Sequence, residues 1–204
     1  MKIICIGRNY ADHARELGNQ IPDEPVIFFK PETALIPKGH PFHYPAFTND
    51  LHYETELVLK ISKNGKKIEE QFAHKYYNSI GIGIDFTARD VQSELKAKGL
   101  PWEKAKGWDF SAPLSREFIN IDDFRNAHGI KFGLKKNDKW VQQGNSSDML
   151  FNFDQLIVHI SKYFTLKMGD LIFTGTPAGV GSIQLGDKLE AFIEDKMMLS
   201  LTVH

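Results

Sequence analysis

The fold of this chain is decided by one stretch, His52-Tyr53-Glu54-Thr55-Glu56-Leu57-Val58-Leu59-Lys60-Ile61. Its second half is rich in aliphatic residues and precedes a polar turn, residues 62–65, which is typical of a β-strand. Because side chains alternate across a strand, Glu54, Glu56 and Val58 are expected on one face. Two carboxylates on one face repel each other, so a buried pair needs a positive partner, and a divalent cation is the simplest. The alternative is a solvated strand end with two surface glutamates.

The composition is that of a single globular domain spanning residues 1–204. Of the 204 residues, 42% are hydrophobic and 25% charged, and the net charge of −1 gives no reason to expect a nucleic acid or a membrane as partner. No apolar run reaches the ~18 residues of a membrane helix, and the N-terminus lacks the long apolar core of a signal peptide. We therefore expect a soluble cytoplasmic protein. The single cysteine, Cys5, lies in an apolar run and is expected to be a buried, inert thiol.

A short helix is expected directly after the N-terminal strand, residues 2–7. Asn9 is its candidate N-cap and Gly18 its end. His13 and Glu16 are three residues apart and therefore share a helix face, either as a functional pair or as an exposed surface pair. A polar loop with two prolines follows, so residues 1–25 are expected to include a lid helix.

Residues 76–86 are expected to form a second buried strand, with an aspartate near its end. Asp85 stands there, just before a helix that Thr87 and Asp90 are expected to cap. A carboxylate between a strand and a helix is a common ligand or catalytic position. The alternative is that Asp85 only helps to cap the helix.

Two lysines also stand at positions of interest. Lys30 ends the apolar strand 26–30. Its charge at this position is explained by an aliphatic stem that lies along the strand while the ammonium reaches water. Lys106 lies in a loop, residues 101–113, in which lysines alternate with aromatic residues, so this loop either holds a substrate anion or is only a packed surface loop.

The remaining elements follow from apolar runs and turn residues. They are a loop over residues 36–50 with surface histidines, paired strands over 129–134 and 139–143, a helix starting at Ser147 or Asp148, a strand over 170–173, a glycine-rich loop over 174–181, and a closing hairpin over 188–193 and 197–203.

Several of these stretches, taken in order, are similar to the motifs of one family. They are Gly-Arg-Asn-Tyr-Ala-Asp-His (7–13), Phe-Lys-Pro (29–31), Glu-Thr-Glu-Leu (54–57), Asp-Phe-Thr-Ala-Arg-Asp-Val-Gln (85–92), Lys106 and Thr-Gly-Thr-Pro (174–177). The chain resembles the fumarylacetoacetate hydrolase family almost from end to end. It is similar to the short members, which consist of the catalytic domain alone.

The resemblance implies a sheet-rich α+β fold, a mixed β-roll with a few peripheral helices, assembled as a homodimer. It also implies that Mg²⁺ or Mn²⁺ is held by Glu54, Glu56 and Asp85. The residues themselves agree with this, because a set of three carboxylates suits a hard cation that keeps positions open for water and substrate.

The resemblance also implies the roles of other residues. Glu16 would orient His13, His13 would activate a water molecule, and Lys106 would balance negative charge that develops in the reaction. Residues expected to hold the oxygens of the substrate are Arg8, Lys30, Gln92 and Thr176.

The implied function is metal-dependent cleavage of a carbon–carbon bond in an acylpyruvate-type oxo acid, through an enolate that the metal stabilises. The same site would suit two alternatives, decarboxylation of oxaloacetate and isomerisation of 2-hydroxyhepta-2,4-diene-1,7-dioate. The His13–Glu16 pair favours hydrolysis. A non-catalytic binding module with a structural cation is the remaining alternative, but three carboxylates leave about half of an octahedral shell open.

Overall fold

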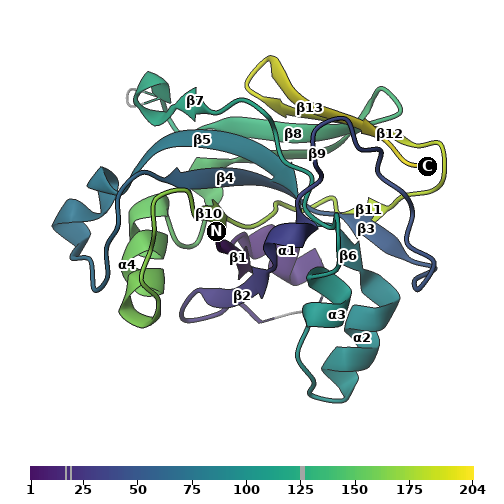
Figure 1. Cartoon of the computed structure of the whole chain (residues 1–204), viewed down its shortest axis with the longest axis horizontal. Helices are drawn as coiled ribbons and strands as arrows, with labels where there is room; N and C mark the ends of the chain where they lie inside the picture. The colour runs from purple at the N-terminus through teal and green to yellow at the C-terminus, as the bar shows by residue number, and fades with distance from the viewer. Residues whose placement is uncertain (17, 19, 125–126) are drawn as a thin grey trace.

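The computed structural model describes residues 1–16, 18, 20–124 and 127–204, and its chain folds into three β-sheets with helices at the periphery (Figure 1). The largest sheet has six strands in the order β2-β1-β10-β4-β5-β7. Its strands are β1 (Ile3–Gly7), β2 (Val26–Lys30), β4 (Thr55–Ile61), β5 (Tyr77–Ile84), β7 (Ile119–Asn120) and β10 (Leu171–Phe173).

The other two sheets are smaller and antiparallel. A three-stranded sheet has the order β11-β3-β6, and a four-stranded sheet has the order β13-β12-β8-β9. Their strands are β3 (Leu51–Tyr53), β6 (Thr87–Ala88), β8 (Lys131–Lys136), β9 (Lys139–Asn145), β11 (Gly181–Ser182), β12 (Lys188–Ile193) and β13 (Lys196–Thr202). The paired strands and the closing hairpin expected from the sequence are thus confirmed.

The α-helices are short and lie around the sheets. In Figure 1, α2 and α3 lie together beside β6, while α4 lies at the opposite side of the molecule. Their bounds are α1 (Ala11–Glu16), α2 (Arg89–Ala97), α3 (Glu103–Lys106) and α4 (Phe153–Tyr163), and 3₁₀ turns cover Glu32–Ala34, Glu70–Lys75, Ile121–Phe124 and Ser146–Asp148. None of these described helices has the length and apolar character that crossing a membrane requires.

The organising stretch is divided between two sheets at Glu54. Residues before it form β3 in the three-stranded sheet, and residues after it form β4 in the six-stranded sheet. Leu57 and Leu59 pack in the larger apolar cluster, whereas Val58 packs in a smaller one with Phe173. This confirms the expected alternation of faces along β4.

Close packing beside β4 depends on a glycine in the neighbouring strand β5. Gly83 pairs with Glu56 across the β4–β5 ladder, and a Cβ atom at Gly83 would lie 2.5 Å from Cε1 of Phe173. Only glycine allows the Phe173 ring to approach this strand so closely.

Three predicted helix starts are wrong, two of them because a side chain serves a tertiary contact. Asn9 does not cap α1: its Nδ2 donates to Phe151 O and Thr174 O, at 3.0 and 2.8 Å, and its Oδ1 accepts from Phe151 N. These bonds fix the turn between β1 and α1. The predicted helix also included Leu17, which lies outside the described residues.

The other two starts are displaced along the chain. Thr87 lies in β6, and Asp90 accepts hydrogen bonds from Thr48 and the Asn49 backbone, so α2 begins at Arg89 without a side-chain cap. Helix α4 begins at Phe153, because Asn152 and Gln155 form a capping box, and residues 146–148 form a 3₁₀ turn.

Candidate active site

The three predicted metal-ligand carboxylates converge where β4 and β5 meet the small sheet. The β4–β5 register pairs Thr55 with Ile84, and the Asp85 backbone N–H donates to Glu54 O at 2.7 Å. Glu54 and Asp85 are therefore neighbours across the ladder, with Glu56 on the same face of β4. One oxygen of each carboxylate lies within 4.8 Å of the other two, and all three residues are buried.

Lys106 neutralises two of these carboxylates. Its Nζ lies 2.7 Å from Glu54 Oε2, 2.6 Å from Asp85 Oδ2 and 2.6 Å from the Thr87 hydroxyl. The side chain comes from the last residue of α3 and is only 4% exposed. Burial alone would lower the pKa of Lys106, but Asp85 and Glu54 reverse this effect and raise it, so the ammonium stays charged.

Arg89 is a second cation on Glu54. Its guanidinium donates to Glu54 Oε1 at 2.5 Å and to Gln92 Oε1 at 2.7 Å. Burial favours the neutral form of Glu54, but Lys106 and Arg89 outweigh burial and lower the pKa of this carboxyl. Glu54 is therefore a carboxylate even without a metal.

Lys30 lies beneath Asp85 and is completely buried. Its Nζ is 2.8 Å from Asp85 Oδ1, and it donates to Phe86 O, Ser111 O and the Ser111 hydroxyl at 3.0–3.2 Å, and also to Lys106 O. The stem does not run to water, so the surface explanation of Lys30 is wrong. Its contacts hold Asp85 in place, while a direct contact with substrate stays a prediction.

Glu56 is the carboxylate without a cation. It is 2% exposed, and its Oε2 accepts from the Gly175 backbone N–H at 2.8 Å, but no lysine or arginine among the described residues pairs with it. Burial, together with Asp85, raises the pKa of Glu56 well above its usual range. A bound cation would stabilise the ionised form of this buried, unpaired carboxylate. The set of three carboxylate oxygens fits Mg²⁺ or Mn²⁺.

His13 and Glu16 form the pair expected on α1. His13 Nδ1 lies 3.5 Å from Glu16 Oε2, and the Glu16 carboxylate also accepts from the Gly179 backbone N–H at 3.1–3.2 Å. His13 is 5% exposed although Glu16 lies at the surface, so the two residues are not a fully exposed surface pair. Burial lowers the pKa of His13 although Glu54 and Glu16 raise it, so the imidazole is neutral near pH 7 and can accept a proton.

Most of the predicted site residues surround one cavity beside the triad. Eight of them line it, whereas Glu16 and Lys30 stand behind His13 and Asp85. Thr176 has a hydroxyl that donates to Thr55 O and accepts from Gln142, so it is tied to β4. The full lining is Ile6, Gly7, Arg8, His13, Phe28, Glu54, Glu56, Asp85, Arg89, Gln92, Lys96, Trp102, Lys106 and Thr176.

The sequence reasoning missed Arg89, Lys96 and Trp102. Arg89 and Lys96 share one face of α2 with the predicted Gln92, at spacings of three and four residues, and this spacing was the signal that could have found them. Trp102 was noted only as part of an aromatic loop.

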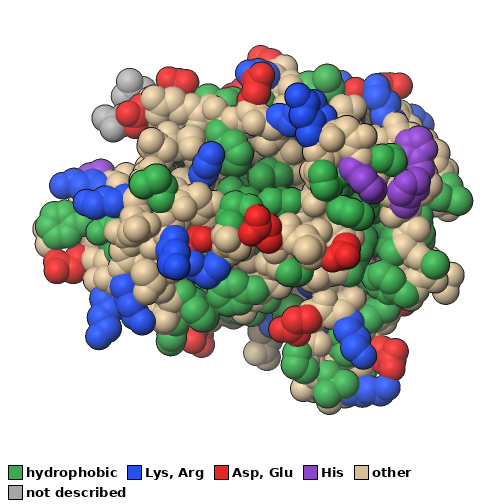
Figure 2. Space-filling model, viewed as in Figure 1, with side chains coloured by type: hydrophobic (Ala, Val, Ile, Leu, Met, Phe, Trp, Pro, Cys, Tyr) green, Lys and Arg blue, Asp and Glu red, His purple; other side chains and the backbone are tan. Residues whose placement is uncertain are grey.

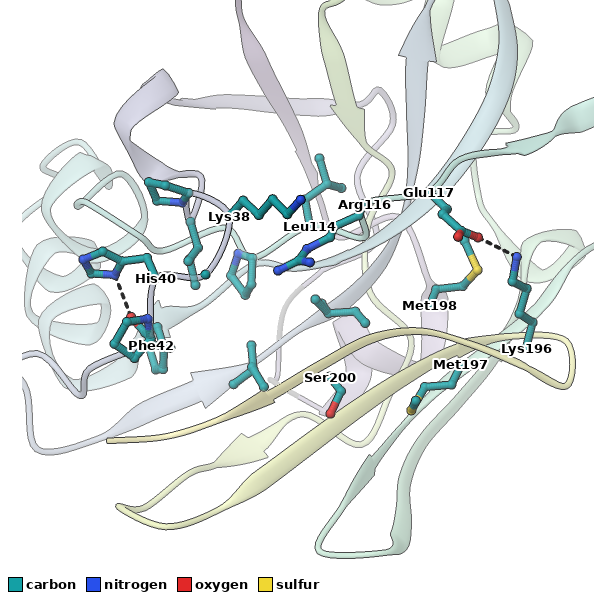
Figure 3. A pocket seen from close by; sticks show the side chains of 17 residues that line it. Lys38, His40, Phe42, Leu114, Arg116, Glu117, Lys196, Met197, Met198 and Ser200 are labelled. Carbon is teal, nitrogen blue, oxygen red and sulfur yellow. Dashed lines mark hydrogen bonds and ion pairs between the residues drawn. The ribbon is translucent and has the colours of Figure 1, made fainter.

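A much larger groove lies elsewhere on the surface. It has a volume of about 730 Å³ and runs between the loop 36–42, the segment 113–117 and β13 (Figure 3). None of the predicted site residues lines it. Size alone is therefore a poor guide here, because the titratable groups with shifted pKa values gather around the small cavity.

Surface charges are dispersed outside this site. Figure 2 shows acidic and basic side chains interspersed over one face, with histidines gathered near one edge. His40 and His43 are exposed loop residues, as expected, and the ring of His43 lies 6.1 Å from that of His204.

Comparison with known proteins decides the family. The profile described as fumarylacetoacetate (FAA) hydrolase C-terminal matches residues 2–204. The chain belongs to the fumarylacetoacetate hydrolase family. The resemblance inferred from the motifs is thus confirmed. Among relatives in this family, a mitochondrial oxaloacetate tautomerase of Bos taurus is 42% identical over 98% of this chain and 90% of the relative. An oxaloacetate tautomerase of Escherichia coli K12 is also 42% identical, over 92% of this chain and 86% of the relative.

Solved structures of the family share the fold over the whole chain. A putative fumarylacetoacetate hydrolase family protein of Yersinia pestis has a TM-score of 0.93 and 38% identity, covering 100% of this chain and 93% of the other. A fumarylpyruvate hydrolase of Pseudomonas aeruginosa, solved with Mn²⁺ and pyruvate, has a TM-score of 0.92 and 33% identity, covering 100% and 89%. The sheet-rich α+β prediction is confirmed.

Proposed function

We propose that this protein is a divalent-metal-dependent enzyme that interconverts the keto and enol forms of oxaloacetate. The observation that carries the proposal is a neutral, buried imidazole, His13, lining the same cavity as three carboxylates of which one lacks a cation. Relatives 42% identical over nearly the whole chain are oxaloacetate tautomerases by name, which supports this choice of substrate.

Glu54, Glu56 and Asp85 are the residues that would hold Mg²⁺ or Mn²⁺. When bound, the cation would act as a Lewis acid on the carboxylate and the adjacent oxo group of the substrate. The role of Lys106 and Arg89 is to keep Glu54 ionised, and that of Lys30 is to fix Asp85.

His13 is the proton carrier in this proposal. Its Nδ1 faces Glu16, which leaves Nε2 for the substrate. Nε2 takes the proton from C3 of the keto form, and the protonated imidazole then delivers a proton to the oxygen at C2, giving the enol. No electrons or other atoms are exchanged, and the reverse reaction uses the same groups. Glu16 stabilises the transient imidazolium and is itself held by Gly179.

The test follows the ultraviolet absorbance of enol-oxaloacetate in the presence of Mn²⁺ or Mg²⁺. We expect the purified protein to accelerate ketonisation, EDTA to abolish the effect, and His13→Gln to remove it without weakening Mn²⁺ binding. A matched control is His43→Gln, because His43 is an exposed loop histidine outside the cavity. Unchanged ketonisation by His13→Gln would overturn the assignment of the base.

Acylpyruvate hydrolysis is the second candidate, favoured by the His13–Glu16 pair and by the likeness to a fumarylpyruvate hydrolase. In this reaction His13 would take a proton from water as it attacks the distal carbonyl carbon. Release of acetate and pyruvate from acetylpyruvate would identify it. Metal-dependent release of CO₂ from oxaloacetate would instead identify a decarboxylase, and conversion of 2-hydroxyhepta-2,4-diene-1,7-dioate an isomerase.

We also propose a homodimer located in the cytoplasm. Exposed Met197 and the half-buried Met198 and Leu199 of β13, which form an edge of the four-stranded sheet, support an apolar contact there. Light scattering after gel filtration tests the oligomeric state, and fractionation of the source cells tests the location.

A further inference from the structure

Two cations at the cavity, Arg8 and Lys96, differ from the others that line it. Each of the remaining cations around the triad pairs with one of its carboxylates. Within the described ranges, neither Arg8 nor Lys96 has a carboxylate partner, although both line the cavity. Glu54 and Asp85 are thus already paired with protein cations, and the positive charges of Arg8 and Lys96 remain for an anion that the protein does not supply.

Helix α2 carries Lys96 to this position. Arg89, Gln92 and Lys96 share one helix face: Gln92 is buried, Arg89 is half-buried, and Lys96 is exposed at the outer end of the row. The end of the helix is fixed, because Leu100 N donates to Leu95 O and Gly99 N to Lys96 O, with Gly99 at φ 64°. This Schellman ending holds the last turn, and Lys96 with it, at the cavity.

An aromatic ring, rather than a carboxylate, steadies the Lys96 ammonium. Its Nζ lies 5.5 Å from the centroid of the Trp102 ring, which packs edge-on against Phe28. A cation–π contact leaves the ammonium with its charge free for a further partner. Partial burial and the nearby Arg8 and Arg89 guanidinium groups lower the pKa of Lys96 by more than Glu54 raises it, as expected where several cations gather.

Arg8 supplies the second half of the arrangement. It directly follows β1 and has a φ of 60°, a left-handed conformation that is uncommon for a residue with a long side chain. Backbone strain of this kind is concentrated at functional sites, where surrounding contacts hold it in place. Here it places Arg8 in the lining of the cavity beside His13.

We propose that Lys96 and Arg8 form a subsite for a second carboxylate of the substrate, and that Lys96 makes the site selective for dicarboxylate oxo acids over those with a neutral tail. The proposal rests on the proposed function, since it concerns the far end of the same substrate. It names Lys96 as a specificity-determining residue and Trp102 as the residue that positions it.

The test compares two ligands that do not turn over. Pyruvate carries one carboxylate beside its oxo group, whereas 3,3-difluoro-oxaloacetate carries a second one and cannot enolise, because C3 bears no hydrogen. Calorimetric titration of the Mn²⁺-loaded protein gives both affinities. We expect Lys96→Gln to weaken binding of the dicarboxylate about three- to tenfold and to leave pyruvate binding unchanged, because a charge-assisted contact is lost at only one end.

Two further variants make the result specific. Lys96→Arg keeps the cation and should retain most of the discrimination. Lys98→Gln is the matched control on the same helix: Lys98 pairs with Glu94 and does not line the cavity, so neither affinity should change. Equal weakening of both ligands in Lys96→Gln, or no weakening of either, would overturn the subsite.

These measurements separate the subsite from the reaction. If the discrimination is lost in Lys96→Gln while the wild type fails to ketonise oxaloacetate, the subsite stands and the proposed function falls. If the wild type ketonises oxaloacetate and Lys96→Gln has the same KM for it, the proposed function stands and the subsite falls.

Discussion

Replacing Lys106 with methionine removes a buried ammonium from between two carboxylates while keeping a side chain of similar length. Lys106 is 3% exposed and makes three short contacts, with Glu54, Asp85 and Thr87. The variant therefore measures how far the acidic site of the metal-free protein depends on this one cation.

The structure sets the size of the effect. Removing one partner of a buried ion pair costs about 3–5 kcal/mol of unfolding free energy. Each carboxylate here keeps a second cation, since Arg89 lies 2.5 Å from Glu54 and Lys30 lies 2.8 Å from Asp85. We therefore expect the low end, about 3 kcal/mol. For a chain of 204 residues, this corresponds to a fall in Tm of roughly 6–12 °C.

Thermal unfolding of the metal-free protein is the assay, with Lys98→Met as control. Lys98 and Glu94 also form an ion pair, at 2.5 Å, but their side chains are 59% and 64% exposed, so the control should leave Tm unchanged. Adding Mn²⁺ should raise the Tm of Lys106→Met more than that of the wild type, because the ion restores positive charge beside Glu54 and Asp85. Equal Tm values for the two variants would refute the reasoning.

Three further predictions concern the base and the packing around it. His13 has a lowered pKa and acts as a base only when neutral, so kcat/KM should fall only as pH drops below the ordinary histidine value near 6.5; a pH–rate profile with its acid limb above that value would contradict the assignment. Gly83→Ala should cost about 1–3 kcal/mol in urea unfolding, because the new Cβ would meet Phe173 at 2.5 Å, whereas Ser79→Ala in the same strand should cost less. Asn9→Ala leaves the backbone groups of Phe151 and Thr174 without their partner and should cost about 1–3 kcal/mol in the same assay. An unchanged free energy of unfolding would contradict this role of the three bonds.

The convergence of Glu54, Glu56 and Asp85 was predictable because it rests on short-range rules. Alternation along a strand places Glu54 and Glu56 on one face, and a strand followed by a helix places Asp85 at a strand end. The spacing of three residues on a helix then places Glu16 beside His13. Each of these inferences needs only neighbours in sequence or a recognised pattern.

The parts that could not be predicted depend on contacts between distant segments. Asn9 looks like a cap, but its side chain bonds to residues more than 140 positions away, and nothing local indicates them. Lys30 looks like a strand end that reaches water, yet β2 ends beneath Asp85. The role of Lys96 depends on where α2 docks, which the helix pattern alone does not reveal.

The main-chain bond between Glu54 and Asp85 has a consequence for how the site behaves as the protein fluctuates. The Asp85 N–H donates to Glu54 O at 2.7 Å, at the junction where one sheet passes into another. Because this bond joins the two backbones directly, we expect Glu54 and Asp85 to move together when the sheets fluctuate. The spacing between the two acidic groups is thereby tied to a main-chain contact rather than to the packing of one sheet on the other.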